Sequence, residues 1–222
     1  HRVDRRQRQM CIRDRVKIAL AEDKPKQLLL ANESGFKVPP GLITNVANDI
    51  IQKTVNEGLI IKPVRQGLVE GESEKVIFTS RIPEVTSKHI PAISQVPSIF
   101  QQEITKKFDV RVTVVGKRIF PVAIWSQNMK ETEVDWRKGG RIDLRHEPIK
   151  LPEKIADSCL ELTTKLGLSF GAIDLICDQQ GNYWFLEINP NGQWAWVENQ
   201  TNLPIASAIV DELVVNGRKN ES

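Results

Sequence analysis

Hydrophobic and polar positions alternate along several segments of the chain, and these segments predict β-strands. In residues 108–115, three valines alternate with Asp109, Arg111 and Thr113. Alternate residues of a strand lie on opposite faces of its sheet, so this strand has one apolar and one polar face. A Gly-Lys turn then leads into residues 118–126, which predicts a hairpin. Further strands are predicted at residues 42–44, 59–63, 76–79 and 99–104.

Other segments place apolar residues at helical spacing. Residues 24–33 predict a helix that Ser-Gly ends, and an asparagine can cap another over residues 47–56. Pro152 opens a helix that reaches Leu166 with one apolar face. A last amphipathic helix is predicted from residue 204 to 215, and residues 127–150 predict a long functional or disordered loop. This mixture of helices, strands and hairpins predicts an α+β (mixed α/β) fold.

The run from residue 170 to 192 has the most informative polar pattern. Two short apolar strands are joined by a Gln-Gln-Gly-Asn turn; the first carries Asp174, and the second carries Glu187 and Asn189. Residues i and i+2 of a strand share a face, and folding of the hairpin can bring Asp174 beside the other two. Two carboxylates and a carboxamide form the kind of oxygen site that holds Mg²⁺ against phosphates.

The alternative is that Asp174 is a turn acid and Glu187 a surface residue. Both lie within apolar strands, where an uncompensated charge is costly, and this favours a bound cation or a charged partner.

Composition excludes several classes of protein. The chain has 222 residues, of which 40% are hydrophobic and 27% charged, as in an ordinary soluble protein of one or two domains. No apolar run is as long as a membrane span, and the chain does not begin with a signal-peptide pattern. The three cysteines are widely spaced and fit a reducing cytoplasm. The isolated His89 and His146 make a zinc site unexpected.

The first fifteen residues differ from the rest of the chain. They hold six arginines, lack periodicity, and include a stretch, residues 10–15, that resembles a translated transposon end used in preparing sequencing libraries. We expect residues 1–15 to be a non-native or disordered segment, joined to a natural protein that begins further upstream. The alternative is a basic arm, which predicts salt-sensitive DNA affinity. Because the remaining net charge is near neutral, we expect no nucleic-acid partner.

Three motifs, in this order and spacing, resemble those of an ATP-grasp carboxylate–amine ligase. They are Gln-Glu-Ile through Asp-Val-Arg-Val-Thr-Val-Val-Gly at 102–116, Val-Asp-Trp-Arg at 134–137, and Phe-Leu-Glu-Ile-Asn-Pro-Asn-Gly-Gln-Trp at 185–194. Within that superfamily the chain is most similar to the microviridin-type (graspetide) maturases of ribosomal peptides. The resemblance covers about residues 23–215. It implies an ATP-grasp fold with the ATP cleft between two α+β subdomains, residues 16–105 and 106–222, and an N-terminal domain missing from this chain.

The resemblance also implies ATP and Mg²⁺ as cofactors and assigns roles to individual residues. The cofactor-binding set comprises two lysines that contact the nucleotide and its phosphates, a hinge at adenine and an acid at the ribose: Lys24, Lys62, Glu103, Ile104 and Asp109. The metal ligands would be Asp174, Glu187 and Asn189. The catalytic residues would be Arg111 and Arg137, of which Arg137 is a cation near the acyl phosphate, with Arg141 and Arg145 as weaker candidates.

Each assignment has a plainer alternative. Lys26 is close enough to be confused with Lys24, and Lys62 can be a strand-end lysine in solvent. Arg111 can pair with Asp109 on the same strand face, as a structural ion pair, or reach a substrate carboxylate. The arginines of the 127–150 loop can simply face solvent. Trp194 and Trp196, which alternate on one side of an expected extended segment, can line a substrate groove or pack in a core.

The implied activity is the ATP-dependent phosphorylation of Asp or Glu side-chain carboxylates in a precursor peptide, followed by formation of ω-ester or ω-amide links. A glutamate ligase that modifies a protein tail or small amino acids is the alternative within this class. A non-catalytic nucleotide-binding fragment is the alternative from another class. We expect a cytoplasmic protein with a peptide partner and no membrane partner, and a homodimer stays open.

Overall fold

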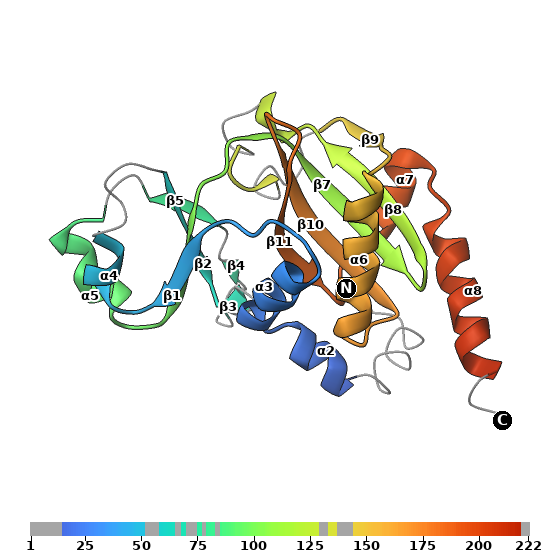
Figure 1. Cartoon of the computed structure of the whole chain (residues 1–222), viewed down its shortest axis with the longest axis horizontal. Coiled ribbons are helices and arrows are strands. Elements are labelled where there is room, and N and C mark those ends of the chain that lie inside the picture. The colour runs from blue at the N-terminus through green and yellow to red at the C-terminus, as the bar shows by residue number, and fades with distance from the viewer. Residues whose placement is uncertain are drawn as a thin grey trace.

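The computed structural model describes residues 15–51, 58–64, 68–69, 75–76, 79–82, 85–128, 133–136 and 144–218. In this part of the chain, strands pair into a four-stranded, a five-stranded and a two-stranded sheet, and helices cover the two larger sheets (Figure 1). The strand pairs within all three sheets are antiparallel. The predicted α+β class is therefore confirmed. None of the described helices is long and apolar enough to cross a membrane.

The smaller of the two main sheets has the strand order β1-β6-β2-β5. Its strands are β1 (Gly41–Thr44), β6 (Ser98–Gln102), β2 (Leu59–Pro63) and β5 (Ser80–Ile82). Helices α4 (Ala47–Ile51) and α5 (Ile90–Ile93) lie at its outer side in Figure 1, and a short 3-10 helix, η1 (Ser87–His89), precedes α5. A separate two-stranded sheet pairs β3 (Leu68–Val69) with β4 (Lys75–Val76). The predicted extension of α4 to residue 56 lies outside the described residues.

The larger sheet has the order β11-β10-β7-β8-β9. Its strands are β7 (Lys106–Val115), β8 (Arg118–Ile124), β9 (His146–Pro148), β10 (Phe170–Asp178) and β11 (Tyr183–Asn189). Both predicted hairpins are present, and Gly116 turns the first of them at a φ of 57°, a conformation that favours glycine. β9 was not predicted, because three residues within a polar loop carry no alternation that a sequence pattern can reveal.

One face of the larger sheet forms the main hydrophobic core. Val110, Val112 and Val114 of β7 pack there, together with core residues of β10, β11 and α6 (Glu153–Lys165): Leu175, Phe185 and Leu162. Helices α2 (Arg15–Ala21) and α3 (Lys24–Glu33) contribute Ala21 and Ala31 to the same cluster. Ala21, Ala31 and Phe36 therefore pack in the core of the larger sheet, although the sequence prediction grouped residues 16–105 as a subdomain separate from residues 106–222.

At one end, the opposite face of the larger sheet packs against two helices. There Val115 and Phe120 pack against α7 (Ala195–Thr201) and α8 (Ile205–Arg218), through Val197 and Ile205. The sequence prediction of an extended segment through Trp194 and Trp196 is wrong, because Trp194 is the N-cap of α7 and Trp196 lies within the helix. Further along the same face, β7 presents the polar residues of its alternating pattern, which positions the site described next.

Candidate functional site

Three charged residues form a row across the centre of the larger sheet. Strand register places Arg111 of β7 opposite Asp174 of β10, and Asp174 opposite Glu187 of β11. Directly opposed residues of antiparallel strands project their side chains on the same face. The hairpin thus brings Asp174 beside Glu187, as its sequence pattern predicts.

A β-bulge in β11 adjusts this register. The pairing passes from Glu187 opposite Asp174 to Phe185 opposite Leu175, so Leu186 is the extra residue. Phe185 and Ile188 are three residues apart and would point to opposite faces of a regular strand, yet both are buried in the main core. Because of the bulge, Phe185 and Ile188 can both point into the core while Glu187 points to the face that carries Asp174.

Arg111 and Asp174 form a buried ion pair. Arg111 Nη1 lies 3.0 Å from Asp174 Oδ1, and the side chains are 7% and 9% exposed. Arg111 therefore pairs across strands with Asp174, and the alternative of a pair with Asp109 on the same strand is wrong. A buried charge needs a partner of opposite sign, and the carboxylate on the neighbouring strand is in direct register.

Lys24 supplies the cation at the other end of the row. Its Nζ lies 3.1 Å from Glu187 Oε2, with both side chains under one fifth exposed. Lys24 thus reaches the predicted metal site, whereas Lys26 donates its backbone N–H to the Asp23 side chain that caps the helix.

Gln27 fixes the position of Lys24, and the sequence analysis missed it. Its buried side-chain amide donates to the carbonyl of Ile188 at 2.9 Å and accepts from the N–H of Ile188 at 3.1 Å. It also donates to the carbonyl of Ala21 at 2.6 Å. This side chain attaches α3 to the outer edge of β11, one turn from Lys24. The signal in the sequence was a glutamine four residues before the buried Ala31, hence on the inner helix face.

Asn189 lies beside the row, two residues after Glu187 on β11 and opposite Ala172 of β10. Its side-chain oxygen accepts the backbone N–H of Asn191 at 2.9 Å, which orients the amide and leaves a second lone pair on that oxygen. Gly192 follows closely: a Cβ at this position would meet the Cβ of Ala172 at 2.3 Å. The chain after β11 therefore approaches the sheet so closely that only glycine fits.

This donor set fits a hard divalent cation. Asp174 and Glu187 are adjacent carboxylates, Asn189 adds an amide oxygen on the same strand face, and all three are oxygen ligands of the type Mg²⁺ prefers. In the described part of the chain no cluster of three or more His, Cys, Asp or Glu side chains forms a metal site. A cation here would be held by the two carboxylates and the amide, with substrate phosphates as further ligands.

Asp109 has a different environment from the one the resemblance implies. Its carboxylate is 3% exposed, receives both Lys106 Nζ contacts at 2.9 and 2.7 Å, and accepts a short hydrogen bond from Ser126 Oγ. Burial raises the pKa of Asp109, and Lys106 and Ser126 oppose that rise. A ribose-contacting acid should be accessible, and in this structure Asp109 is a buried ion-pair partner instead. Lys106, three residues earlier, was not predicted.

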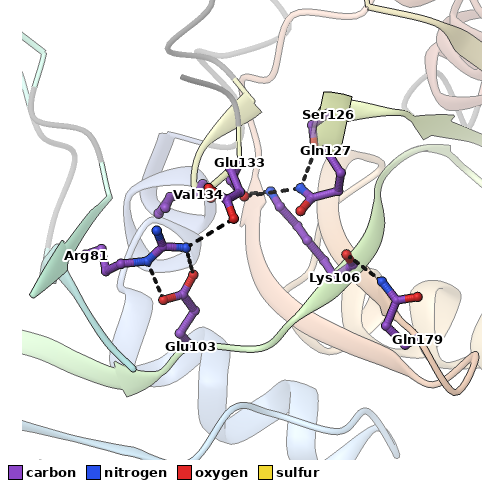
Figure 2. A network of polar contacts seen from close by, with 8 residues as sticks. All are labelled: Arg81, Glu103, Lys106, Ser126, Gln127, Glu133, Val134 and Gln179. Carbon is purple, nitrogen blue, oxygen red and sulfur yellow. Dashed lines mark hydrogen bonds and ion pairs between the residues drawn. The ribbon is translucent and has the colours of Figure 1, made fainter. Parts of the chain in front are cut away.

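The hinge region carries a second polar network, shown in Figure 2. Arg81 of β5 donates to both carboxylate oxygens of Glu103, at 2.7 and 2.5 Å, and lies 3.6 Å from the Glu133 carboxylate. The backbone N–H of Glu103 donates to the carbonyl of Gly58 at 2.7 Å. Glu103 and Ile104 thus lie on the connection between the two main sheets, as a hinge requires. Their backbone contact to adenine stays a prediction.

Residues 133–136 are held over the start of β7 by the same network. Lys106 Nζ donates to the carbonyl of Val134 at 3.4 Å, and Gln127 Nε2 donates to the carbonyl of Glu133 at 3.2 Å (Figure 2). The segment ends at Trp136, whose ring faces Arg111: the guanidinium carbon lies 5.5 Å from the Trp136 ring centroid. The predicted Arg137 and Arg141 lie outside the described residues.

Lys62 lies on the smaller sheet and is 8% exposed. Leu59 and Ile61 of the same strand belong to the core beneath α4 and α5, so alternation turns Lys62 to the other face. The alternative of a solvent-exposed strand-end lysine is therefore wrong. Arg145 is an exposed residue that pairs with Glu147 at 2.9 Å and contributes nothing to the row.

Comparison with known proteins identifies the family. Residues 21–213 match the family described as RimK-like ATP-grasp domain. Among solved structures, a RiPP-associated ATP-grasp ligase of Chryseobacterium gregarium, in complex with ADP and a leader and core peptide, superposes with a TM-score of 0.83 at 30% identity over 90% of this chain and 62% of that one. The macrocyclase MdnC of Microcystis aeruginosa, bound with precursor peptide MdnA, gives 0.73 at 33% identity over 90% and 63%.

A curated relative gives a second point of reference. The D-alanine–D-alanine ligase of Dechloromonas aromatica is 26% identical over 77% of this chain and 58% of its own length. The chain thus spans about six tenths of the length of these three proteins.

Proposed function

This chain belongs to the RimK-like ATP-grasp family, and on that premise we propose that it acts in an ATP- and Mg²⁺-dependent ligase that crosslinks a ribosomal precursor peptide. An Asp or Glu side-chain carboxylate of the peptide attacks the γ-phosphorus of ATP and ADP leaves, giving an acyl phosphate. A hydroxyl or amine of the same peptide then attacks the acyl carbon, and phosphate leaves with loss of a proton. The product is an ω-ester or ω-amide link.

The row on the larger sheet, in which two adjacent carboxylates lie between two cations, is the observation that carries this proposal. Arg111, Asp174, Glu187 and Lys24 stand side by side, with each carboxylate matched by a cation. Such a row suits phosphoryl transfer, which depends on positioning and charge neutralisation more than on covalent catalysis. Similarity to two peptide-modifying ligases supports the peptide as substrate.

Individual residues receive roles on the same basis. Asp174, Glu187 and Asn189 would hold Mg²⁺, which supplies charge neutralisation at the transferring phosphoryl group. Lys24 and Lys62 would contact the phosphates, and the backbone at Glu103 and Ile104 would bind adenine. Arg111 and Arg137 would stabilise the acyl phosphate. Asp109 is left out, because its carboxylate is occupied by Lys106 and Ser126.

Nucleotide binding tests the metal assignment. The purified chain is titrated with Mn²⁺ and ADP, and bound Mn²⁺ is followed by electron paramagnetic resonance. We expect Glu187→Gln to weaken ADP-dependent Mn²⁺ binding by about tenfold or more, because it removes a charged oxygen ligand. Glu161→Gln is the matched control, since Glu161 pairs with Lys165 on the outer surface of α6. Equal binding by Glu187→Gln and the wild type would show the metal assignment to be wrong.

Mass spectrometry tests the reaction. The chain is incubated with ATP, Mg²⁺ and peptides that carry Asp or Glu together with Thr, Ser or Lys. Loss of one water mass per crosslink supports the proposal. Gain of amino-acid residue masses favours the second candidate, a ligase of amino acids, for which similarity to a D-alanine–D-alanine ligase is the supporting observation. ADP binding without either product favours a nucleotide-binding module.

A further inference from the structure

Two tryptophans converge on Arg111 from segments far apart in the chain. Trp136 belongs to the segment 133–136, and Trp196 to α7. Their ring centroids are 5.2 Å apart with planes tilted by 45°, and the Arg111 guanidinium carbon lies 5.5 and 5.9 Å from them. The three groups form a nearly equilateral triangle, so one cation rests against both rings. We call Trp136 and Trp196 the tryptophan pair.

The tryptophan pair holds Arg111 without using its hydrogen-bond donors. A cation is attracted to the electron-rich face of an indole, whereas the guanidinium N–H groups point outward in the plane of the group. One of these donors is engaged by Asp174. Arg111 Nε is buried, and none of the described residues accepts a hydrogen bond from it. The geometry therefore fixes the guanidinium while keeping donor capacity for another acceptor.

Charge balance indicates what that acceptor is. With two carboxylates and two protein cations, the row is neutral. A divalent cation shared by Asp174 and Glu187 adds two positive charges and competes with Arg111 for Asp174. An anion beside Arg111 would compensate the guanidinium charge that Asp174 then shares with the cation, because buried or half-buried like charges repel strongly when uncompensated.

Both tryptophans are themselves held in place. Trp136 follows Val134 and Glu133, whose carbonyls accept from Lys106 and Gln127. The Glu133 carboxylate contacts Arg81, which also binds the hinge residue Glu103 (Figure 2). On the other side, the His146 ring meets Trp196 edge-on at 5.3 Å. Ring positions that are fixed from three strands and a helix are typical of preorganisation for a ligand.

We propose that Trp136 and Trp196 are positioning residues, which hold Arg111 so that its free donors bind the carboxylate or acyl-phosphate group of the substrate once a divalent cation occupies Asp174. This inference rests on the proposed function, and it assigns to the tryptophan pair a role that the reaction scheme does not contain. In this scheme the pair acts through Arg111.

Inorganic phosphate, added to the chain at saturating Mg²⁺ and ADP, serves as the probe for the substrate anion. Its dissociation constant is measured by calorimetry for the wild type, Trp136→Phe and Trp136→Leu. We expect Trp136→Leu to weaken phosphate binding about tenfold and Trp136→Phe to stay within about threefold of the wild type, because phenylalanine keeps an aromatic face. Affinity for Mg²⁺ and ADP without phosphate should not change in either variant.

Trp184→Leu is the matched control. Trp184 lies on β11, and Lys37 Nζ lies over its ring, 5.4 Å from the centroid. The Trp184→Leu variant therefore loses a cation–π contact of the same kind, but one that lies away from the row. It should bind phosphate like the wild type. Equal phosphate affinity of the Leu and Phe variants at position 136 would overturn the proposal, as would an equal loss in the Trp184→Leu control. If Trp136→Leu does not fold, the same pair of substitutions at Trp196 makes the comparison.

A double-mutant cycle separates this inference from the proposed function. Unfolding of the wild type, Arg111→Met, Trp136→Leu and the double variant is measured by urea titration without ligand. We expect a coupling of about five- to thirtyfold in the unfolding equilibrium constant. No coupling overturns the positioning role whatever the nucleotide results are. If the wild type instead shows the coupling between Arg111 and Trp136 but fails to bind Mg²⁺ and ADP, the proposed function is refuted. That result would leave the tryptophan pair as a support of Arg111 with no role in binding a substrate anion.

Discussion

Replacing Lys106 with methionine should destabilise the protein strongly. Lys106 and Asp109 form an ion pair with side chains only 4% exposed, at 2.7 Å. Methionine fills a similar volume without charge. The Asp109 carboxylate then stays buried, and of the side chains that now donate hydrogen bonds to it, Ser126 remains. It also removes the donor to the carbonyl of Val134.

The expected magnitude follows from the cost of an uncompensated buried charge. Removing one partner of a buried ion pair costs about 3–5 kcal/mol. A domain of this kind is stable by about 5–15 kcal/mol in total. We expect a loss near 3 kcal/mol, the lower end of the first range, because Ser126 continues to donate to Asp109 and the carboxyl group can bind a proton.

The loss should depend on pH with a defined sign. Burial raises the pKa of Asp109 in the folded protein above its unfolded value of about 4, so the folded state binds the proton more tightly. Stability therefore falls as pH rises between the two pKa values. Removal of Lys106 takes away the main opposing effect and extends this fall to higher pH. The variant should differ little from the wild type near pH 4 and most near pH 8.

Urea unfolding at pH 5 and pH 8 measures this difference. Lys165→Met is the matched control: its partner Glu161 is 51% exposed on the side chain, and such surface pairs contribute about 0–1 kcal/mol. Adding Asp109→Asn to Lys106→Met should restore much of the stability, since the buried charge is gone. A loss below about 1 kcal/mol, or an equal loss at both pH values, would refute the reasoning.

Three further predictions concern other parts of the fold. Gly192→Ala should cost about 1–3 kcal/mol in urea unfolding, since its Cβ would meet that of Ala172 at 2.3 Å, and Ala172→Gly should rescue it; absence of rescue would contradict the contact. Gln27→Leu leaves the N–H and the carbonyl of Ile188 without their partner, which should lower the free energy of unfolding by about 1–3 kcal/mol for each group. Hydrogen exchange at the Ile188 amide should become faster, and unchanged exchange would argue against the attachment of α3 to β11. Burial raises the pKa of Cys159 to about 12, so iodoacetamide at pH 8 should modify it only after unfolding, as peptide mass spectrometry would reveal; rapid labelling in the folded state would contradict its burial.

Local patterns in the sequence determined most of the fold. The valines that alternate with Asp109, Arg111 and Thr113 predict both the strand and its apolar face, because side-chain direction in a strand depends only on position. The hairpin that carries Asp174 and Glu187 follows from its turn and its two apolar runs. Helices α2 and α7 and strands β3, β5 and β9 were not predicted, because each is too short for a periodic signal.

The partners of the charged residues could not be predicted in this way. The sequence suggested an ion pair between Arg111 and Asp109. In the structure Arg111 pairs with Asp174, which is opposite it in the strand register, and Asp109 pairs with Lys106. In the sequence Gln27 is an ordinary helix residue, and its role follows only from the packing of α3 against β11. A pairing of this kind depends on which groups are buried together, and that follows from packing between distant segments.

The sequence by itself therefore determined most of the strands and helices, and it placed Asp174, Glu187 and Asn189 on one hairpin as candidate metal ligands, because these are properties of neighbouring residues. Only the tertiary structure decided that α3 brings Lys24 to Glu187 and that two tryptophans from distant segments meet at Arg111. The physical reason is that a buried charge must find its partner in space, and closeness in space is set by the assembled sheet and helices.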